Sequence, residues 1–300
     1  MTRPDDEDGG VTTTVRSEAE ARVRAEIDRL DLGPFAAELE EQGVTVVPPE
    51  RVGGPALADE LFEIVLDLME RRTGVRPDVA SGTTHINVCF PTLYYVLFED
   101  ERFQTWLLDP VMGALVDLLL GEQCLLHTTT LFMKGPTDPP ESGLQLGLHS
   151  DQQMVPEPFP SYALIAGATL LLTDYSRDDG AFAYVPGSHR EGRHPLPGEG
   201  VDRVVAIDAP RGSLLVHHGG LWHGSFGKTT PGLRAGLAYA YCRMFVTPME
   251  AYGEHVTPEL LARHPARFAR LLGQDLPIRT TEAGPDLTTV ATAVARSPFD

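Results

Sequence analysis

The sequence contains few cysteines, few basic residues and no long apolar segment. Cys89, Cys124 and Cys242 are too few and too dispersed for a disulfide framework or a zinc ribbon. The 24 Lys and Arg residues stand against 43 Asp and Glu, a net charge of −19, so the basic field that nucleic acid or an anionic membrane attracts is missing. No run reaches the roughly 18 apolar residues of a membrane span or signal-peptide core. We therefore expect a cytoplasmic protein that binds neither nucleic acid nor membranes.

The remaining composition is that of a folded domain. Hydrophobic residues make up 42% of the 300 residues, which is enough for a sizeable core. Residues 1–15 are acidic and then rich in Gly and Thr, which predicts a disordered arm. Residues 16–275 are predicted to form a single domain, and residues 276–300 an irregular tail.

Helical and strand-like patterns divide the chain at Gly121. Helical periodicity occurs at 17–32, 55–74, 102–121 and 257–273, with Pro110 and Pro265 interrupting the last two segments. After Gly121, short apolar runs alternate with turn residues about every ten positions, which is typical of antiparallel sandwiches and barrels. The runs are 124–133, 144–149, 163–174, 180–186, 203–207, 213–218 and 233–246. We expect a barrel-like β core with helices packed outside it.

Three side chains have the chemistry and spacing of a metal site. His149 and Asp151 end a strand-like run, and residues two apart on a strand project from the same face. His223, which follows a later strand-like run, supplies a third donor from a distant segment. Two histidines and one carboxylate leave three positions open on a metal ion, the arrangement of non-haem Fe(II) oxygenases.

Arg234 begins another strand-like run, eleven residues after His223. The face of that strand continues with Gly236, Ala238 and Ala240, three small residues at a period of two. A charged group beside small side chains predicts a cavity in which the guanidinium binds a ligand carboxylate. The alternative is that Arg234 is an ordinary surface residue of a barrel strand.

The region 131–246 resembles the phytanoyl-CoA dioxygenase family of Fe(II)/2-oxoglutarate oxygenases. The resemblance depends on several motifs in the right order, namely MKGP (133–136), HSD (149–151), SRDDGAFAYVPGSH (176–189), GSLLVHHGGLWHGS (212–225) and the arginine at 234. It implies a mainly β fold with flanking helices and a double-stranded β-helix core, also called a jelly roll or cupin-like fold. It also implies Fe(II), 2-oxoglutarate and O2 as cofactor and cosubstrates.

The resemblance assigns roles to individual residues. It implies that His149, Asp151 and His223 bind the iron, and that Arg234 pairs with the distal carboxylate of 2-oxoglutarate. Ser225 lies two residues past His223 and is expected to add a hydrogen bond there.

Other positions are more ambiguous. Thr169 is either a contact of the cosubstrate or an ordinary β-branched strand residue. His127, His217 and His218 lie in strand-like runs and are expected to be hydrogen-bonded core residues or supports of the site. His218 is the more probable support by resemblance. Lys134 is expected to be a solvated residue at a strand end.

The residues that contact the substrate are the least defined. Thr130 and Phe132 share one strand face and are candidates to line the cavity, with Gln153 as a candidate in the divergent segment 152–160. The aromatic stretch 84–98 either covers the pocket mouth or forms a core strand or helix. The composition, rich in Ala, Arg, Gly and Pro, is typical of a high-GC bacterium, where such enzymes often act in secondary metabolism.

We therefore predict a hydroxylase that oxidises a C–H bond of a small organic molecule and releases succinate and CO2. By resemblance, Asp151 favours hydroxylation, desaturation or epoxidation over halogenation, because related halogenases have a small residue there that leaves room for a halide. A desaturase or epoxidase of the same family, a cupin-like metal isomerase without a cosubstrate, and a non-catalytic binding protein are the alternatives. The sequence leaves the oligomeric state open.

Overall fold

The computed structural model describes residues 20–84, 92–137, 141–276 and 280–285. The expected arm at 1–15 and Cys89 lie outside these residues. In the tail that was expected to be irregular, a short hairpin joins β11 (Thr280–Thr281) and β12 (Gly284–Pro285).

The helices form where the sequence predicts them, with one addition. Residues 20–29 are helical, and the further helices are α2 (Gly33–Gln42), α3 (Gly54–Thr73), α4 (Glu101–Leu107), α5 (Pro110–Leu120), α6 (Pro258–Ala262) and α7 (Ala266–Leu271). Pro110 begins α5, and the Asp109 side chain caps this helix by accepting a hydrogen bond from the Met112 amide. Pro265 separates α6 from α7. The sequence reading missed α2, because it is short and follows the first helix after only a tight turn.

Ten strands build the core. They are β1 (Val44–Val47), β2 (Thr92–Tyr94), β3 (Leu125–Lys134), β4 (Leu144–His149), β5 (Ile165–Leu171), β6 (Phe182–Tyr184), β7 (Val205–Ala206), β8 (Leu214–His218), β9 (His223–Phe226) and β10 (Arg234–Cys242). β1, β2 and β9 were not among the runs predicted from the sequence. Each is at most four residues long, too short to give a clear pattern.

The pairing of these strands is nested. β3 pairs with β10, β4 with β9, β5 with β8 and β6 with β7, all antiparallel. Folding a long hairpin back on itself in this way gives a jelly roll, so the predicted mainly β architecture with flanking helices is confirmed. The larger sheet has the order β1-β8-β5-β10-β3-β2 and the smaller sheet β4-β9-β6-β7.

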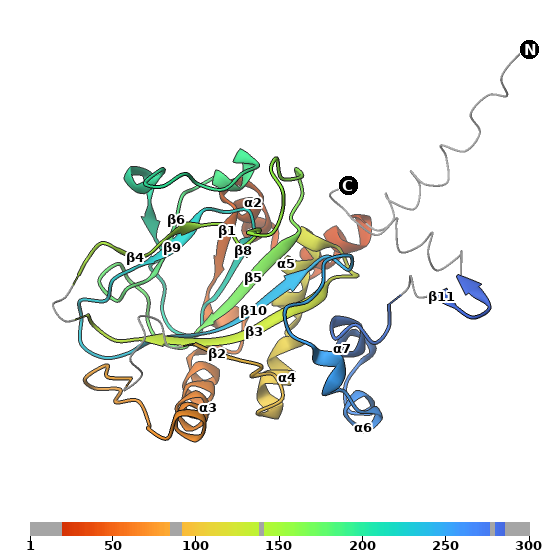
Figure 1. Cartoon of the computed structure of the whole chain (residues 1–300), viewed down its shortest axis with the longest axis horizontal. Coiled ribbons are helices and arrows are strands. Elements are labelled where there is room, and N and C mark those ends of the chain that lie inside the picture. Colours follow the sequence, from red (N-terminus) through yellow and green to blue (C-terminus); the bar gives the residue numbers. More distant parts are fainter. Residues whose placement is uncertain (1–19, 85–91, 138–140, 277–279, 286–300) are drawn as a thin grey trace, which may run out of the picture.

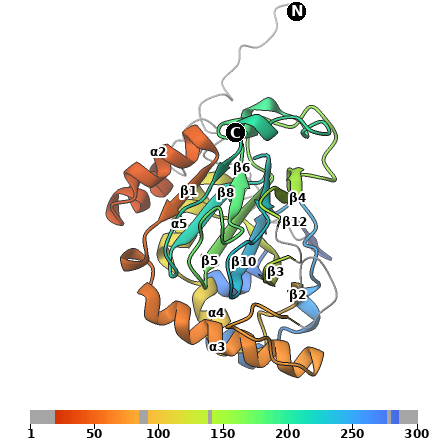
Figure 2. The same ribbon diagram turned by 90° about the vertical axis from the view of Figure 1, so that its left-hand side faces the viewer.

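The two faces of the larger sheet have different neighbours. Its outer face packs against α5, which contacts β5, β8 and β10, and forms the main hydrophobic core. Figure 2 shows α2 and α3 to one side of this sheet and β4 of the smaller sheet to the other. The inner face therefore looks toward the smaller sheet.

The strand register identifies the residues on the inner face. Paired residues on neighbouring strands project to the same side, and Ala238 pairs with both Thr130 and Thr169. Arg234, Gly236 and Ala240 share this side by alternation along β10, as predicted. Figure 1 shows β3, β5 and β10 side by side. The inner face thus presents small and polar groups next to Arg234.

Part of the aromatic stretch 84–98 can be placed. Residues 85–91 lie outside the described residues, and β2 forms an edge strand beside β3. Among the described residues, no single helix is long and apolar enough to cross a membrane. Only α4 and α5 taken together reach that length and hydropathy, and they are bent by 52° at the break between them.

We predict that Gly167→Ala destabilises the fold by roughly 1–3 kcal/mol, as overpacked core positions do. Gly167 pairs with His217, and a Cβ atom at this position would lie 2.0 Å from Cε1 of the His217 ring. Chemical denaturation of the purified protein measures the effect.

Gly147→Ala in β4 is the matched control, since its Cβ atom would meet nothing within 4 Å. We expect this variant to differ from wild type by no more than about 0.5 kcal/mol. Equal stability of the two variants would show that the His217 ring does not fill the space above Gly167.

Candidate functional site

Strand pairing brings the three predicted metal ligands together. His149 is the last residue of β4 and pairs with His223, the first residue of β9, while Asp151 follows β4 by two residues. The donor atoms of these three side chains lie within 4.8 Å of one another. The three side chains are therefore close enough to hold one metal ion.

Backbone hydrogen bonds orient both imidazoles. Nδ1 of His149 lies 3.0 Å from the Gly147 carbonyl oxygen, and Nδ1 of His223 lies 3.0 Å from that of Leu221. With Nδ1–H donating to a carbonyl, each ring presents the lone pair of Nε2. These Nε2 atoms lie 4.0 Å (His149) and 3.5 Å (His223) from Oδ1 of Asp151. Two nitrogens and one carboxylate oxygen thus face a common point.

The second oxygen of Asp151 has a different partner. Oδ2 lies 2.9 Å from Nε2 of His217, the residue whose ring occupies the space above Gly167. The Asp151 amide donates to the Gly219 carbonyl at 2.8 Å, which fixes the backbone as well. His217 therefore holds the carboxylate with Oδ1 directed toward the two imidazoles.

The support expected from His218 is supplied by its neighbour. His218 follows His217 on β8 and so projects to the opposite side of the sheet. There its Nδ1 accepts a hydrogen bond from the Gly220 amide at 2.9 Å. The direct contact with Asp151 belongs to His217. Sequence spacing alone does not show which of two adjacent histidines faces the site.

Burial sets the protonation of the cluster. It lowers the pKa of His223 to about 3 despite the nearby Asp151 carboxylate, so the ring is neutral and able to bind a metal. Burial alone would raise the pKa of Asp151, but the imidazoles of His223, His217 and His149 outweigh it and hold that pKa far below its usual range. His223 is therefore a neutral nitrogen donor and Asp151 an anionic oxygen donor.

Arg234, at the start of β10, is buried with only 2% of its surface exposed, so the surface alternative is wrong. Its guanidinium carbon lies 4.2 Å from the centre of the Tyr175 ring and 4.8 Å from that of Phe132. Nε and Nη1 have no hydrogen-bond partner within the described part of the chain. Burial lowers the pKa of this group, which expresses the cost of an uncompensated charge.

Lys134 and Ser225 are also buried, which corrects the expectation of a solvated lysine. Lys134 pairs with Arg234 across β3 and β10, so its side chain projects toward the smaller sheet rather than into solvent. Its Nζ donates to Oγ of Ser225 at 3.1 Å and to the Phe226 carbonyl. Among the described residues, the recorded side-chain partner of Ser225 is thus Lys134 rather than Arg234.

The remaining predicted contacts occupy different surroundings. Thr169 is buried on the inner face opposite Ala238, and Thr130 and Phe132 lie half-buried on the same face. Gln153 is exposed in the turn after Asp151. The structure thus places three of these four side chains on the face that bears Arg234.

Comparison with known proteins agrees with this architecture. An uncharacterised protein of Mycobacterium tuberculosis is 28% identical over 174 residues, 58% of this chain and 63% of its own length, so the chain spans less than two thirds of that relative.

Two solved structures share the fold. HygX from Streptomyces hygroscopicus, crystallised with nickel and 2-oxoglutarate, has a TM-score of 0.57 and 20% identity over 73% of this chain and 89% of its own. SnoN, a non-haem α-ketoglutarate-dependent epimerase from nogalamycin biosynthesis, has a TM-score of 0.55 and 18% identity over 71% and 83% of the two chains.

The family model of phytanoyl-CoA dioxygenase matches residues 39–236, which include the His149–Asp151–His223 cluster and Arg234. This match covers more than half of the chain and agrees with the motifs and the nested strand pairing. The chain belongs to the phytanoyl-CoA dioxygenase family.

Proposed function

We propose that this protein is an Fe(II)/2-oxoglutarate-dependent oxygenase that hydroxylates a C–H bond of a small organic molecule. In this reaction 2-oxoglutarate and O2 are consumed, and succinate and CO2 are released with the hydroxylated product. His149, Asp151 and His223 are the proposed iron ligands, and Arg234 is the proposed anchor of 2-oxoglutarate. Family membership and the geometry of these four side chains support the proposal.

The donor set fits Fe(II). Two neutral imidazoles and one carboxylate on one side of an ion are the ligands of non-haem Fe(II) oxygenases, and three positions remain for other ligands. His217 holds Oδ2 of Asp151, so Oδ1 alone is directed at the ion. A carboxylate restrained to one donor oxygen keeps the other positions available to the cosubstrate and O2.

The observation on which the proposal depends is the buried guanidinium of Arg234. A buried charge is costly unless it is paired, and two of its nitrogens find no acceptor in the described residues. A carboxylate of the ligand would satisfy them with two parallel hydrogen bonds. A metal isomerase without a cosubstrate would have no need for this cation, so the oxygenase is the better supported function.

Bound iron would supply the oxidative chemistry, and the protein would supply position and exclusion of water. The three ligands hold the metal at the ends of β4 and β9, while Arg234 is oriented by the rings of Tyr175 and Phe132. On the same face of β10, Gly236 makes room for the Phe132 ring and the Tyr175 hydroxyl, and Ala238 and Ala240 continue the face with small side chains. The chain thereby fixes the cosubstrate at both ends.

Hydroxylation is the proposed outcome because Asp151 occupies the position that a halide would need on the metal. Desaturation and epoxidation remain the alternatives, and SnoN illustrates that a similar fold also serves epimerisation. A role in secondary metabolism is part of the proposal and is supported by the assignment of SnoN to nogalamycin biosynthesis. The cytoplasmic location stays a prediction.

We predict that Arg234→Ala raises the dissociation constant for 2-oxoglutarate by about 30-fold or more. Loss of a bidentate charge-assisted pair costs roughly 2 kcal/mol or more, which corresponds to this factor. Calorimetric titration of the Mn(II)-loaded protein with 2-oxoglutarate measures it. Because the substitution removes an unpaired buried charge, we expect the fold to survive.

Two variants serve as references for this titration. Arg234→Lys should restore affinity only in part, since an ammonium group cannot form the two parallel hydrogen bonds. Arg203→Ala, at an exposed position, should leave the constant unchanged. If Arg234→Ala bound 2-oxoglutarate as tightly as wild type, Arg234 would not be part of the cosubstrate site.

We also predict oxygenation rather than chlorination. With a substrate that accelerates succinate release, and with isotopically labelled oxygen and chloride both present, mass spectrometry should find labelled oxygen in a hydroxylated product. One succinate should form per product molecule. A chlorinated product without new oxygen would show that Asp151 does not occupy a metal position.

A further inference from the structure

A buried carboxylate joins three segments next to the proposed active site. Glu250 is only 4% exposed, and its Oε1 accepts hydrogen bonds from Thr128 Oγ1 at 2.7 Å, the Thr129 amide at 3.2 Å and the Tyr95 amide at 3.0 Å. Its Oε2 accepts from Thr129 Oγ1 at 3.0 Å. These contacts tie the residue after β2 to the middle of β3.

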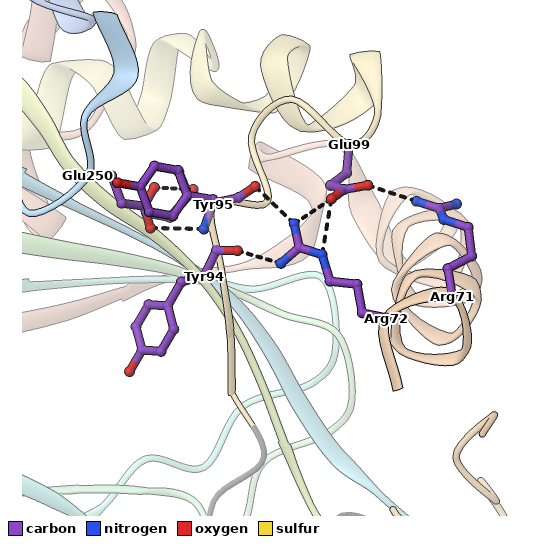
Figure 3. Close-up of polar contacts among 7 residues, drawn as sticks. Arg71, Arg72, Tyr94, Tyr95, Glu99 and Glu250 are labelled. Carbon is purple, nitrogen blue, oxygen red and sulfur yellow. Dashed lines mark hydrogen bonds and ion pairs between the residues drawn. The ribbon is translucent and has the colours of Figure 1, made fainter. Parts of the chain in front are cut away.

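A guanidinium holds the same turn from the other side, as Figure 3 shows. Arg72 of α3 donates to the carbonyl oxygens of Tyr94 at 2.6 Å and Tyr95 at 3.2 Å, and its Nε donates to Glu99 at 3.0 Å. Arg71 also pairs with Glu99, at 3.1 Å. Tyr95 has a φ of +57°, a conformation that non-glycine residues rarely adopt and that clusters at functional sites.

The backbone at Tyr94 and Tyr95 is therefore held from two sides. The side chain of Tyr94 takes no part in these contacts. Tyr94 pairs with Thr130, so its ring projects to the same side as Thr130 and Ala238, the inner face. In Figure 3 the Tyr94 ring points away from Glu250, whereas Tyr95 lies beside it. The ring is 52% exposed, and its hydroxyl makes no hydrogen bond to any described residue.

His127 lies next to the same carboxylate. The pairing of β3 with β10 skips His127, since Thr128 pairs with Ala240 and Leu126 with Tyr241. Such a bulge turns a side chain out of the regular alternation and is common beside active sites. The His127 carbonyl accepts from the amides of Met249 and Glu250, at 2.9 and 3.2 Å, which fixes the bulge.

The His127 imidazole is 7% exposed, and its buried Nδ1 has no partner among the residues described. Burial lowers the pKa of this ring, although the carboxylates of Asp151 and Glu250 both act to raise it, so the ring is neutral. A buried N–H without an acceptor is rarer than an unsatisfied acceptor, which favours the proton on Nε2. Nε2–H is then available as a donor, and the Asp151 carboxylate is near enough to act electrostatically on the ring.

We propose that Tyr94 and His127 form the substrate-binding wall of the site, with the Tyr94 ring packed on an apolar face of the substrate and His127 Nε2–H donating to an uncharged oxygen. This inference rests on the proposed oxygenase function and extends it to a class of substrate. Each residue lies one position from Tyr95 or Thr128, which bond to the same oxygen of Glu250, so this one carboxylate fixes the backbone beside both of them.

The charges around this wall select the class of substrate. Glu250 and Asp151 are the carboxylates that act on His127, and the nearby Arg72 is engaged by Glu99 and two carbonyls. Once 2-oxoglutarate pairs with Arg234, the charges that act on His127 are these carboxylates, so an uncharged substrate is favoured over an anionic one. The small residues Ala238 and Ala240 on the facing part of β10 leave room for a bulky, planar molecule.

Fluorescence titration with two naphthalene probes tests the wall. Prodan is planar and uncharged with a ketone oxygen, and ANS is a naphthalene sulfonate anion. We expect the full chain, loaded with Mn(II) and 2-oxoglutarate, to bind prodan saturably and more tightly than ANS. Tyr94→Ala and His127→Phe should each weaken prodan binding by about fivefold to tenfold.

Reference variants distinguish the loss of a contact with the probe from a general effect on folding. Tyr94→Phe keeps the ring and His127→Gln keeps a donor, so both should retain most of the affinity. Val79→Ala, at an exposed apolar residue next to the Asp78–Thr83 bridge, should not change it. Prodan binding that is absent from wild type, or equal in all variants, would overturn the proposal, as would tighter binding of ANS.

The affinity for 2-oxoglutarate, measured by calorimetry on the same samples, distinguishes this proposal from the proposed function. If 2-oxoglutarate binds and neither Tyr94→Ala nor His127→Phe weakens prodan binding, the proposal of the wall is wrong and the oxygenase proposal stands. If wild type fails to bind 2-oxoglutarate with metal present, the oxygenase proposal fails, and with it the assignment of the wall to a substrate.

Discussion

The buried guanidinium of Arg234 is the constraint around which this site is organised. Two of its nitrogens find no acceptor among the described residues, and a buried charge is costly unless a partner such as a ligand carboxylate pairs with it. The rings of Tyr175 and Phe132 hold the group in place without neutralising it. A dianionic cosubstrate would satisfy both ends of the site, because one carboxylate can meet the metal and the other Arg234. The energetic cost of the empty site and the affinity for 2-oxoglutarate are thus two aspects of one interaction.

The nested strand pairing determines how far the proposed metal ligands lie from Arg234. β4 and β9 pair so that His149 and His223 are opposite each other, and β10 begins at Arg234 and continues with small residues. The proposed metal ligands lie in or directly after strands of the smaller sheet, and Arg234 begins a strand of the larger one, so the proposed cosubstrate site lies between the two sheets. The same strand pairing places Gly167 opposite His217, and the His217 ring in turn orients Asp151. Fold and site therefore depend on the same backbone pairings.

Local patterns in the sequence sufficed for much of this arrangement. His149 and Asp151 at a spacing of two, and the small residues after Arg234, are properties of single strands, and the structure places them as predicted. The role of His217 rather than His218, and the burial of Lys134, could not be derived in the same way. They depend on which face of a strand meets a partner that is distant in sequence. The roles now proposed for Tyr94 and His127 could not be assigned from the sequence for the same reason, since a three-residue edge strand and a bulge have no periodic pattern.

The central claim is that this chain assembles an Fe(II)–2-oxoglutarate chelate on His149, Asp151 and His223. Anaerobic addition of Fe(II) and then 2-oxoglutarate to the purified protein tests it most directly, because the chelate has a weak visible charge-transfer band. The account predicts that the band appears only when both are present, saturates at one iron per chain, and is absent from His149→Ala and His223→Ala. No band in wild type, or an undiminished band in these variants, would contradict it.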